Sequence, residues 1–155
     1  MGKEIERKFL VTDPGYREGS LGIHHRQGYL STAKERTVRV RTVEDKGFLT
    51  IKGLTRGISR AEFEYEIPLH DAEEMLGFCE GSIVEKMRYR VMHDDLIWEV
   101  DEFLGENLGL IVAEVELESE DQEIRRQSWV GEEVSADPRY INSNLARNPY
   151  KSWKT

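Results

Sequence analysis

Short segments in which polar and apolar residues alternate follow one another along the chain. Successive side chains of an extended strand point to opposite faces, so a two-residue period predicts strands with one polar and one apolar face. Asp45-Lys46-Gly47 and Asp94-Asp95 are typical of hairpin turns, which predicts antiparallel neighbours. The pattern predicts strands at residues 3–11, 24–31, 36–44, 47–54, 59–67, 83–92, 96–103 and 109–118.

The pattern in the rest of the chain predicts little helix. One short helix is predicted at residues 70–80, with Asp71 as its N-cap and Gly81 as its C-terminal stop. The segment from Glu120 onward favours helical turns and loops that pack on the outside. Many strands with a few helices between them indicate an α+β domain built on a large antiparallel sheet or barrel.

The polar faces of these strands carry full charges. One wet face is the usual meaning of alternation, and for any single strand an ordinary solvated sheet would explain the pattern. The charged faces, strand by strand, are Glu4, Glu6 and Lys8; Arg39 and Arg41; Lys52; Arg60, Glu62, Glu64 and Glu66; Lys86, Arg88 and Arg90; Glu99 and Asp101; and Glu114, Glu116 and Glu118.

The distribution of sign argues against a solvated surface for the whole set. Glu-x-Glu pairs recur in the first, fifth and eighth predicted strands, and Arg39-x-Arg41 and Lys86-x-Arg88 place cations side by side. Like charges on neighbouring positions repel one another unless an ion of opposite sign lies between them. The sequence therefore predicts an eight-stranded antiparallel closed β-barrel, or tunnel, with an ionic interior and helices packed on the outside. Eight strands can enclose a small ligand.

The residue types indicate a chemistry for this interior. Carboxylate oxygens are hard ligands that suit Mg²⁺ or Mn²⁺, and such ions usually bridge to substrate phosphates. Arg and Lys side chains would neutralise the remaining phosphate oxygens. Together they predict a site for a chain of phosphates with a divalent metal at one end. Hydrolysis in such a site needs mainly positioning, charge neutralisation and an oriented water.

Composition narrows the class of protein. The 155 residues predict a single domain, 1–155. A net charge of −8 argues against a nucleic-acid binder but allows a local cationic cluster for a small polyphosphate. The single cysteine, Cys79, excludes an intrachain disulfide and fits a reducing cytoplasm. We expect a cytoplasmic protein, because the sequence contains no membrane-length apolar run and no signal peptide.

Several segments together resemble one protein family. Glu4-Ile5-Glu6-Arg7-Lys8 is similar to the Glu-x-Glu-x-Lys signature of the CYTH superfamily, the triphosphate tunnel metalloenzymes. Further similar segments follow in the family's order across nearly the whole chain. They are Gln27–Leu30, Thr37–Arg41, Thr50–Lys52, Arg60–Glu66, Glu85–Tyr89, Trp98–Asp101, Ala113–Leu117 and Trp129–Val134.

The resemblance implies roles for individual residues. The metal-binding residues would be Glu4, Glu6, Glu114 and Glu116, with Asp101 as a further contributor. The substrate-binding and catalytic cations would be Lys8, Arg39, Arg41, Lys52, Lys86 and Arg88. Glu62 and Glu64 would line the tunnel and orient those cations or position water. Arg90, Glu66 and Glu118 lie on the same faces and are expected nearer the rim.

The resemblance also implies an activity. Compact bacterial members that resemble this chain are inorganic triphosphatases, so we expect metal-dependent hydrolysis of tripolyphosphate to pyrophosphate and phosphate. The alternatives are a class IV adenylyl cyclase, a nucleoside or thiamine triphosphatase, and a non-catalytic module that binds polyphosphate or nucleotides. The expected partner is a small-molecule triphosphate, without nucleic acid or membrane, and a homodimer stays open. Tyr29 is equally suited to the lumen and to outside packing, and the sequence assigns no general base.

Overall fold

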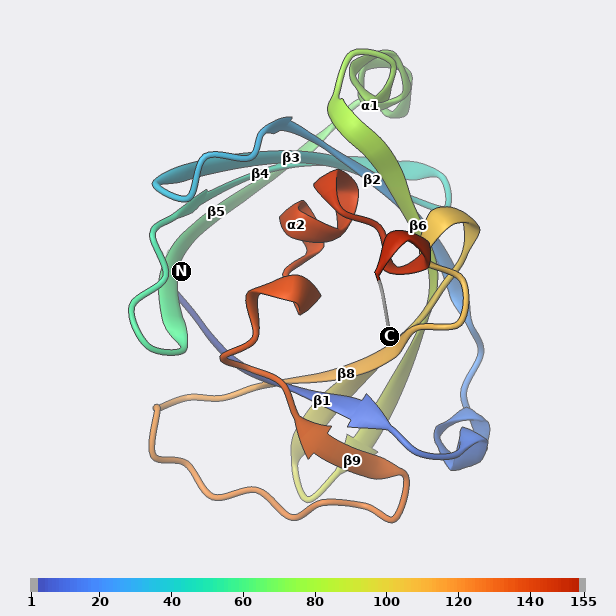
Figure 1. Ribbon diagram of the computed structural model, residues 1–155, viewed down its shortest axis with the longest axis vertical. Coiled ribbons are helices and arrows are strands. Elements are labelled where there is room, and N and C mark those ends of the chain that lie inside the picture. The colour runs from blue at the N-terminus through green and yellow to red at the C-terminus, as the bar shows by residue number, and fades with distance from the viewer. Residues whose placement is uncertain (1–2, 154–155) are drawn as a thin grey trace.

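The computed structural model describes residues 3–153, and its strands close into an antiparallel barrel (Figure 1). The barrel strands are β1 (Lys3–Val11), β2 (Ile23–Ser31), β3 (Arg36–Val43), β4 (Lys46–Gly53), β5 (Ser59–Ile67), β6 (Glu80–His93), β7 (Leu96–Phe103) and β8 (Ile111–Glu116). Around the barrel they follow the order β5-β4-β3-β2-β6-β7-β8-β1, and β1 pairs with β5 to close the ring. The predicted eight-stranded closed barrel is confirmed.

Two tight hairpins set the register of their strands. Asp94 and Asp95 connect β6 to β7 with φ angles of 51° and 61°. Asp tolerates this left-handed conformation, which matches the twist of a two-residue hairpin. The β3–β4 turn lies one residue earlier than predicted, at Glu44 and Asp45, because Lys46 already pairs with Val43. The expectation of antiparallel neighbours is confirmed at both turns.

Strand β1 has three neighbours, and one of them was not predicted. Strand β8 runs along one edge of β1, while the other edge pairs with β5 at Lys3–Ile5 and with β9 (Val130–Glu133) at Phe9 and Val11. The prediction of only turns and loops in this part of the tail was therefore wrong. Four residues are too short for a clear alternation, and β9 forms because β1 offers an edge that β5 leaves open.

Helix α1 (Leu69–Leu76) begins and ends earlier than predicted. Pro68 occupies its N-cap and Gly77 its C-cap, so the assignments of Asp71 and Gly81 to these positions were wrong. Gly81 lies within β6 instead, at φ +70°, where an added Cβ would stand 2.5 Å from the Ala146 carbonyl oxygen. Glycine is needed there because another backbone segment approaches closely.

The outer face of the barrel is apolar and is covered in two places. Helix α1 lies outside the ring of strands and packs Ala72 and Leu76 against Val40 (Figure 1). A 3₁₀ turn, η1 (Pro14–Arg17), and the segment before β9 cover β1, β7 and β8, where Trp98 and Trp129 are buried. No helix within residues 3–153 has the length and apolar character needed to cross a bilayer.

The C-terminal segment lies within one end of the barrel ring, not on its outside as predicted (Figure 1). After a short turn, η2 (Gly105–Asn107), the later elements are η3 (Pro138–Tyr140), α2 (Asn142–Arg147) and η4 (Tyr150–Ser152). Leu145 and Ala146 of α2 belong to an apolar cluster with Tyr29, Val84 and Phe103. Barrel positions at this end are apolar, so burying α2 against them removes both surfaces from water.

Candidate active site

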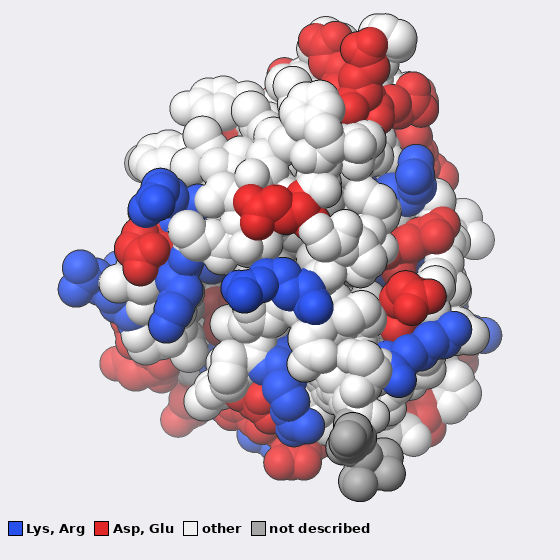
Figure 2. Space-filling view, turned by 45° about the horizontal axis from the view of Figure 1, so that its top comes forward, with Lys and Arg blue, Asp and Glu red and all other residues white. Residues whose placement is uncertain are grey.

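The barrel encloses a cavity of about 200 Å³, called the tunnel below. Acidic and basic side chains are interspersed on the outer face shown in Figure 2. The like charges that stand side by side along single strands belong instead to residues that line the tunnel. Every predicted site residue except Asp101 lines the tunnel. Its lining consists of Glu4, Glu6, Lys8, Tyr29, Arg39, Arg41, Lys52, Arg60, Glu62, Glu64, Lys86, Arg88, Glu99, Glu114, Glu116, Ile141, Asn142 and Ser143.

Two arginines of β3 share one carboxylate of β5. The Nη2 atoms of Arg39 and Arg41 lie 3.1 Å and 3.2 Å from Glu64 Oε2, and Thr50 donates its hydroxyl to the same oxygen at 2.6 Å. Burial and the charge of Arg39 lower the pKa of Arg41 to about 10. One carboxylate cannot neutralise two guanidinium groups, so this wall keeps an excess of positive charge.

A second cationic pair comes from β6 and rests on Asp101 of β7. Lys86 Nζ lies 2.8 Å from Asp101 Oδ2, and Arg88 donates to both carboxylate oxygens at 2.7 Å and 2.8 Å. Burial by itself would raise the pKa of Asp101, but Arg88 and Lys86 outweigh it and hold the pKa well below its usual range. Asp101 therefore lies behind its two cations, only 1% exposed and outside the tunnel lining.

Two further lysines are paired with the predicted metal-binding carboxylates. Lys52 Nζ lies 3.2 Å from both carboxylate oxygens of Glu4, and Arg60 Nε lies 3.4 Å from Glu4 Oε1. Although burial opposes it, these two cations lower the pKa of Glu4. Lys8 Nζ lies 3.6 Å from Glu114 Oε2. Burial opposes the charged form of Glu114 as well, but Lys8 and Arg88 lower its pKa. Glu4 and Glu114 are thus ionised and partly neutralised within the tunnel.

Glu6 and Glu116 have a different environment. They are cross-strand partners on β1 and β8, and neither forms a salt bridge with a side chain in residues 3–153. Burial raises the pKa of Glu6 to about 8, and the carboxylates of Glu114 and Glu4 act in the same direction. Burial and Glu4 likewise raise the pKa of Glu116. Lys8 and Lys52 oppose the shift at Glu6, and Lys52 opposes it at Glu116, but they do not outweigh it. Among the described residues, this pair is therefore less well neutralised than Glu4 and Glu114.

The donor set at this pair fits a hard divalent cation. In the described part of the chain, no three His, Cys, Asp or Glu side chains are arranged closely enough to surround an ion by themselves. Mg²⁺ does not require such a cage, because it usually binds one or two carboxylates and completes its shell with water and substrate phosphate oxygens. Two facing carboxylates beside a cationic wall are consistent with that mode of binding.

Several tunnel residues were missing from the predicted site. Arg60 and Glu99 stand on charged strand faces, so the alternation that identified their neighbours also identified them as candidates. Tyr29, left open by the sequence, lines the tunnel and is 3% exposed. Residues 141–143 carried no signal, because they reach the tunnel only through the position of the C-terminal segment.

The three residues expected nearer the rim do not line the tunnel. Arg90 and Glu118 line a separate hollow that shares Glu99 and Glu116 with the tunnel. Glu66 lies in the part of β5 that pairs with Phe48 of β4. All three therefore lie outside the tunnel lining, on strands whose other charged residues form it.

Comparisons with known proteins found two inorganic triphosphatases that are similar to this chain. An inorganic triphosphatase of Acetivibrio thermocellus is 52% identical over 155 residues, which is 99% of this chain and 99% of the relative. An inorganic triphosphatase of Nitrosomonas europaea is 40% identical over 148 residues, covering 92% of this chain and 96% of the relative.

A solved structure and a family model point the same way. The crystal structure of an inorganic triphosphatase superposes with a TM-score of 0.68 at 36% identity, covering 92% of this chain and 96% of the other. The family model described as the CYTH domain matches residues 2–147. The resemblance seen in the ordered sequence segments is thereby confirmed. This chain belongs to the CYTH domain family.

Proposed function

We propose that this protein is an inorganic triphosphatase that hydrolyses tripolyphosphate to pyrophosphate and phosphate with a divalent metal ion. One observation carries the proposal: a single tunnel combines a cationic wall with a cross-strand pair of carboxylates, Glu6 and Glu116, that forms no salt bridge within residues 3–153. A metal-bound triphosphate would bring its negative charge to the cationic wall and its metal ion to the two carboxylates. The names of the two curated relatives support the same activity.

The phosphate chain would be bound by the tunnel cations. Arg side chains can bind two phosphate oxygens at once, and Lys side chains act as point charges. Their cross-strand carboxylates hold them in place before substrate arrives, which lowers the cost of ordering on binding. The proposed substrate-binding set is Lys8, Arg39, Arg41, Lys52, Lys86 and Arg88.

The metal would be held mainly by Glu6 and Glu116, with Glu4 and Glu114 beside them. Oxygen-only donors suit Mg²⁺ or Mn²⁺. When bound, such an ion neutralises phosphate charge and can activate a water molecule. Asp101 is better suited to orient Lys86 and Arg88 than to bind the metal, because it lies behind them.

The side chains of the tunnel would contribute to hydrolysis by positioning the triphosphate and by neutralising its negative charge. Phosphoryl transfer spreads negative charge over the transferred oxygens, so fixed cations around the phosphate stabilise its transition state. In this tunnel, Glu64 holds Arg39 and Arg41, and Glu62 lies 3.6 Å from Lys52 Nζ. Burial strengthens these interactions, because little water screens them.

The dimensions of the tunnel favour a compact anion over a nucleotide. Sites for organic ligands usually measure about 300–1,000 Å³ and are mostly apolar. The tunnel is smaller, at about 200 Å³, and Tyr29 is the single aromatic side chain among its described lining residues. A cyclase acting on ATP or a thiamine triphosphatase would need space and contacts for the organic group. A cytoplasmic location and the absence of nucleic-acid and membrane partners remain predictions.

Product identification tests the proposed activity. The pure protein is incubated with tripolyphosphate, ATP or thiamine triphosphate, each with Mg²⁺ or Mn²⁺, and every product is identified. We expect pyrophosphate and phosphate from tripolyphosphate, with much slower turnover of the two organic substrates. Cyclic AMP formed from ATP would establish the cyclase instead, and tight binding of tripolyphosphate without turnover would establish a binding module.

Variants assign the turnover to the tunnel. Glu116→Ala should abolish hydrolysis at limiting metal, whereas Arg41→Ala should mainly raise KM for tripolyphosphate. Glu118→Ala serves as the matched control, because it removes an exposed carboxylate of the same chain segment outside the tunnel lining. Near-normal hydrolysis by Glu116→Ala at limiting metal would contradict the metal assignment.

A further inference from the structure

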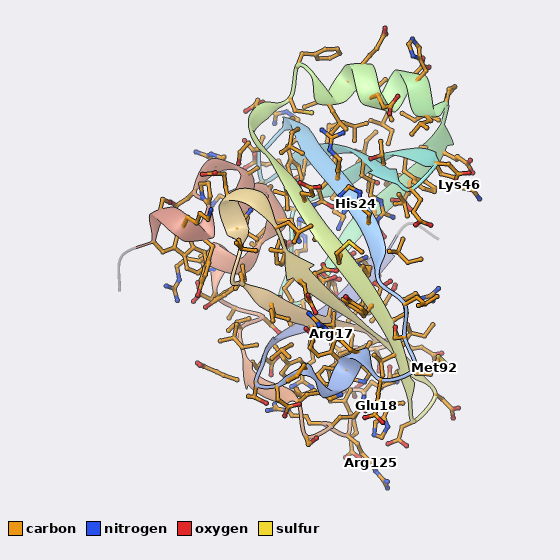
Figure 3. All side chains as sticks on the ribbon, turned by 90° about the vertical axis from the view of Figure 1, so that its right-hand side faces the viewer. Arg17, Glu18, His24, Lys46, Met92 and Arg125 are labelled. Carbon is orange, nitrogen blue, oxygen red and sulfur yellow. The ribbon has the colours of Figure 1, made fainter. Side chains whose placement is uncertain are left out.

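His25 is a buried histidine that the triphosphatase proposal does not use. It lies on β2, is 5% exposed, and is the cross-strand partner of Lys86 on β6 and of Val43 on β3. Its neighbour His24 points to the outer surface, where it is 42% exposed and contacts Glu85 (Figure 3, with His24 labelled). Adjacent positions in a strand face opposite ways, so only His25 points towards the tunnel cations.

The imidazole of His25 contacts one of the tunnel arginines. His25 Nδ1 lies 3.4 Å from Arg41 Nη1. A guanidinium group has donors only, so Nδ1 must be the acceptor in this long hydrogen bond, and the ring proton then lies on Nε2. His25 is therefore a neutral imidazole in this arrangement.

The surroundings keep this imidazole neutral. Burial, together with the charges of Arg88, Lys86 and Arg41, lowers the pKa of His25 to about 2, and Asp101 opposes this only weakly. A protonated ring would lose its acceptor and would add a charge among three cations. His25 consequently offers Arg41 an uncharged acceptor at neutral pH.

Arg41 has few other contacts that fix its direction. Its Nη2 donates to Glu64, its guanidinium carbon lies 5.3 Å from the centre of the Phe48 ring, and its buried Nε has no hydrogen-bond partner among the described residues. Glu64 also serves Arg39. His25 and Glu64 therefore hold the two ends of the Arg41 fork from different strands.

We propose that His25 is a positioning residue that orients Arg41 towards the triphosphate without neutralising its charge. This inference rests on the proposed function. The contrast with Asp101 gives the physical reason. Asp101 orients Lys86 and Arg88, but its carboxylate also cancels one of their two charges. A neutral acceptor orients an arginine and leaves its full charge for the substrate phosphate.

Three substitutions separate the acceptor from the charge. His25→Asn keeps a neutral acceptor at the position of Nδ1, because Asn Oδ1 is the same number of bonds from the backbone. His25→Leu fills similar space without an acceptor, and His25→Asp adds a negative charge at the same atom. His24→Asn is the matched control on the outer face.

The readouts are KM and kcat for tripolyphosphate, together with the unfolding temperature of each variant. We expect wild-type values for His24→Asn and a KM within about threefold of wild type for His25→Asn. His25→Leu should raise KM roughly tenfold, the effect of losing one hydrogen bond to a charged group. His25→Asp should raise KM at least as much as His25→Leu, because it neutralises Arg41.

Calorimetric binding of tripolyphosphate to the same variants keeps the two proposals distinct. If the wild-type protein binds tripolyphosphate without hydrolysing it, the proposed function fails, while the order of affinities among the His25 variants still tests the inference. A wild-type KM and affinity in His25→Leu would overturn the positioning role. Equal increases in KM for His25→Asn and His25→Leu would overturn the role of the hydrogen-bond acceptor. Equal KM values for His25→Asn and His25→Asp would overturn the argument that the acceptor must be neutral.

Discussion

Glu6 on β1 and Glu116 on β8 are direct cross-strand partners on adjacent strands, and both have raised pKa values because burial and neighbouring carboxylates disfavour their charged forms. Like charges placed directly opposite destabilise a strand pair by about 0.2–1 kcal/mol. At a pH high enough to ionise both carboxylates, the metal-free protein therefore has like-charge repulsion at this pair, and a bound cation would relieve it.

Removing one of these charges should have opposite effects with and without metal. In the presence of a chelator and at a pH above 8, where Glu6 is ionised, Glu116→Gln should raise the unfolding temperature by up to about 4 °C, the shift expected for up to 1 kcal/mol in a chain of this size. Added Mg²⁺ should stabilise the wild type through binding and stabilise Glu116→Gln much less. Thermal unfolding with Mg²⁺ and with EDTA measures both effects. An equal Mg²⁺-induced shift in the two proteins would exclude Glu116 from the metal site.

Asp101→Asn should lower the free energy of unfolding without weakening metal binding. The substitution leaves Lys86 and Arg88 buried beside a neutral amide, and removing one partner of a buried ion pair costs about 3–5 kcal/mol. Urea unfolding should show this loss, and Mg²⁺ affinity measured on folded protein should stay near the wild-type value. A large loss of Mg²⁺ affinity would make Asp101 a metal ligand. Glu99→Gln, which removes a more exposed partner of Arg88, should cost much less.

Gly81→Ala should displace the C-terminal segment from the barrel. A Cβ at Gly81 would lie 2.5 Å from the Ala146 carbonyl oxygen, and the residue has a φ angle of +70°. Gly105→Ala is a matched control, because Gly105 has a φ angle of +61° and no atom within 4 Å of the added Cβ. The left-handed conformation costs both variants about 1–2 kcal/mol, so any further loss in Gly81→Ala measures the contact with α2. Equal urea midpoints for the two variants would contradict the position of α2.

The ion pair between Arg7 and Glu133 should make the fold sensitive to acid. Arg7 donates to both oxygens of Glu133 at 2.9 Å and 2.6 Å and lowers the pKa of Glu133 from 4.5 to about 2. A folded-state pKa below the unfolded value stabilises the protein above pH 4.5, and this contribution is lost as pH falls towards 2. Glu133→Gln should therefore be less stable than wild type at pH 7, with a smaller difference at pH 3. Glu132→Gln, on the exposed side of the same strand, is the control. A difference independent of pH would contradict this coupling.

The tunnel walls could be predicted because alternation is a local property of the chain. In any extended strand the side chains of Glu4, Glu6 and Lys8 share one face, whatever lies beside it. The same argument placed Arg39 with Arg41 and Lys86 with Arg88, and all of these residues line the tunnel. The repulsion within each group then required an ion of opposite sign, which is why a closed barrel could be inferred before any strand pairing was known.

Other features depend on partners that are distant in sequence. Asp101 shares the polar face of its strand with Glu99, and only the approach of Lys86 and Arg88 decides that it supports cations from behind the tunnel wall. His25 showed no sign of a role until β2 and β3 paired and brought it to Arg41. In both cases the side chain's function follows from its neighbour's charge, which local periodicity does not contain.

The sequence by itself determined the strand faces, the closed barrel and the charged character of its interior, since each follows from side-chain direction and like-charge repulsion along single strands. Tertiary structure alone decided that β9 completes the free edge of β1 and that α2 is buried within one end of the barrel. These segments are too short to specify their own partners. They fold where the barrel leaves unpaired backbone groups and apolar surface, and those sites exist only once the strands have closed.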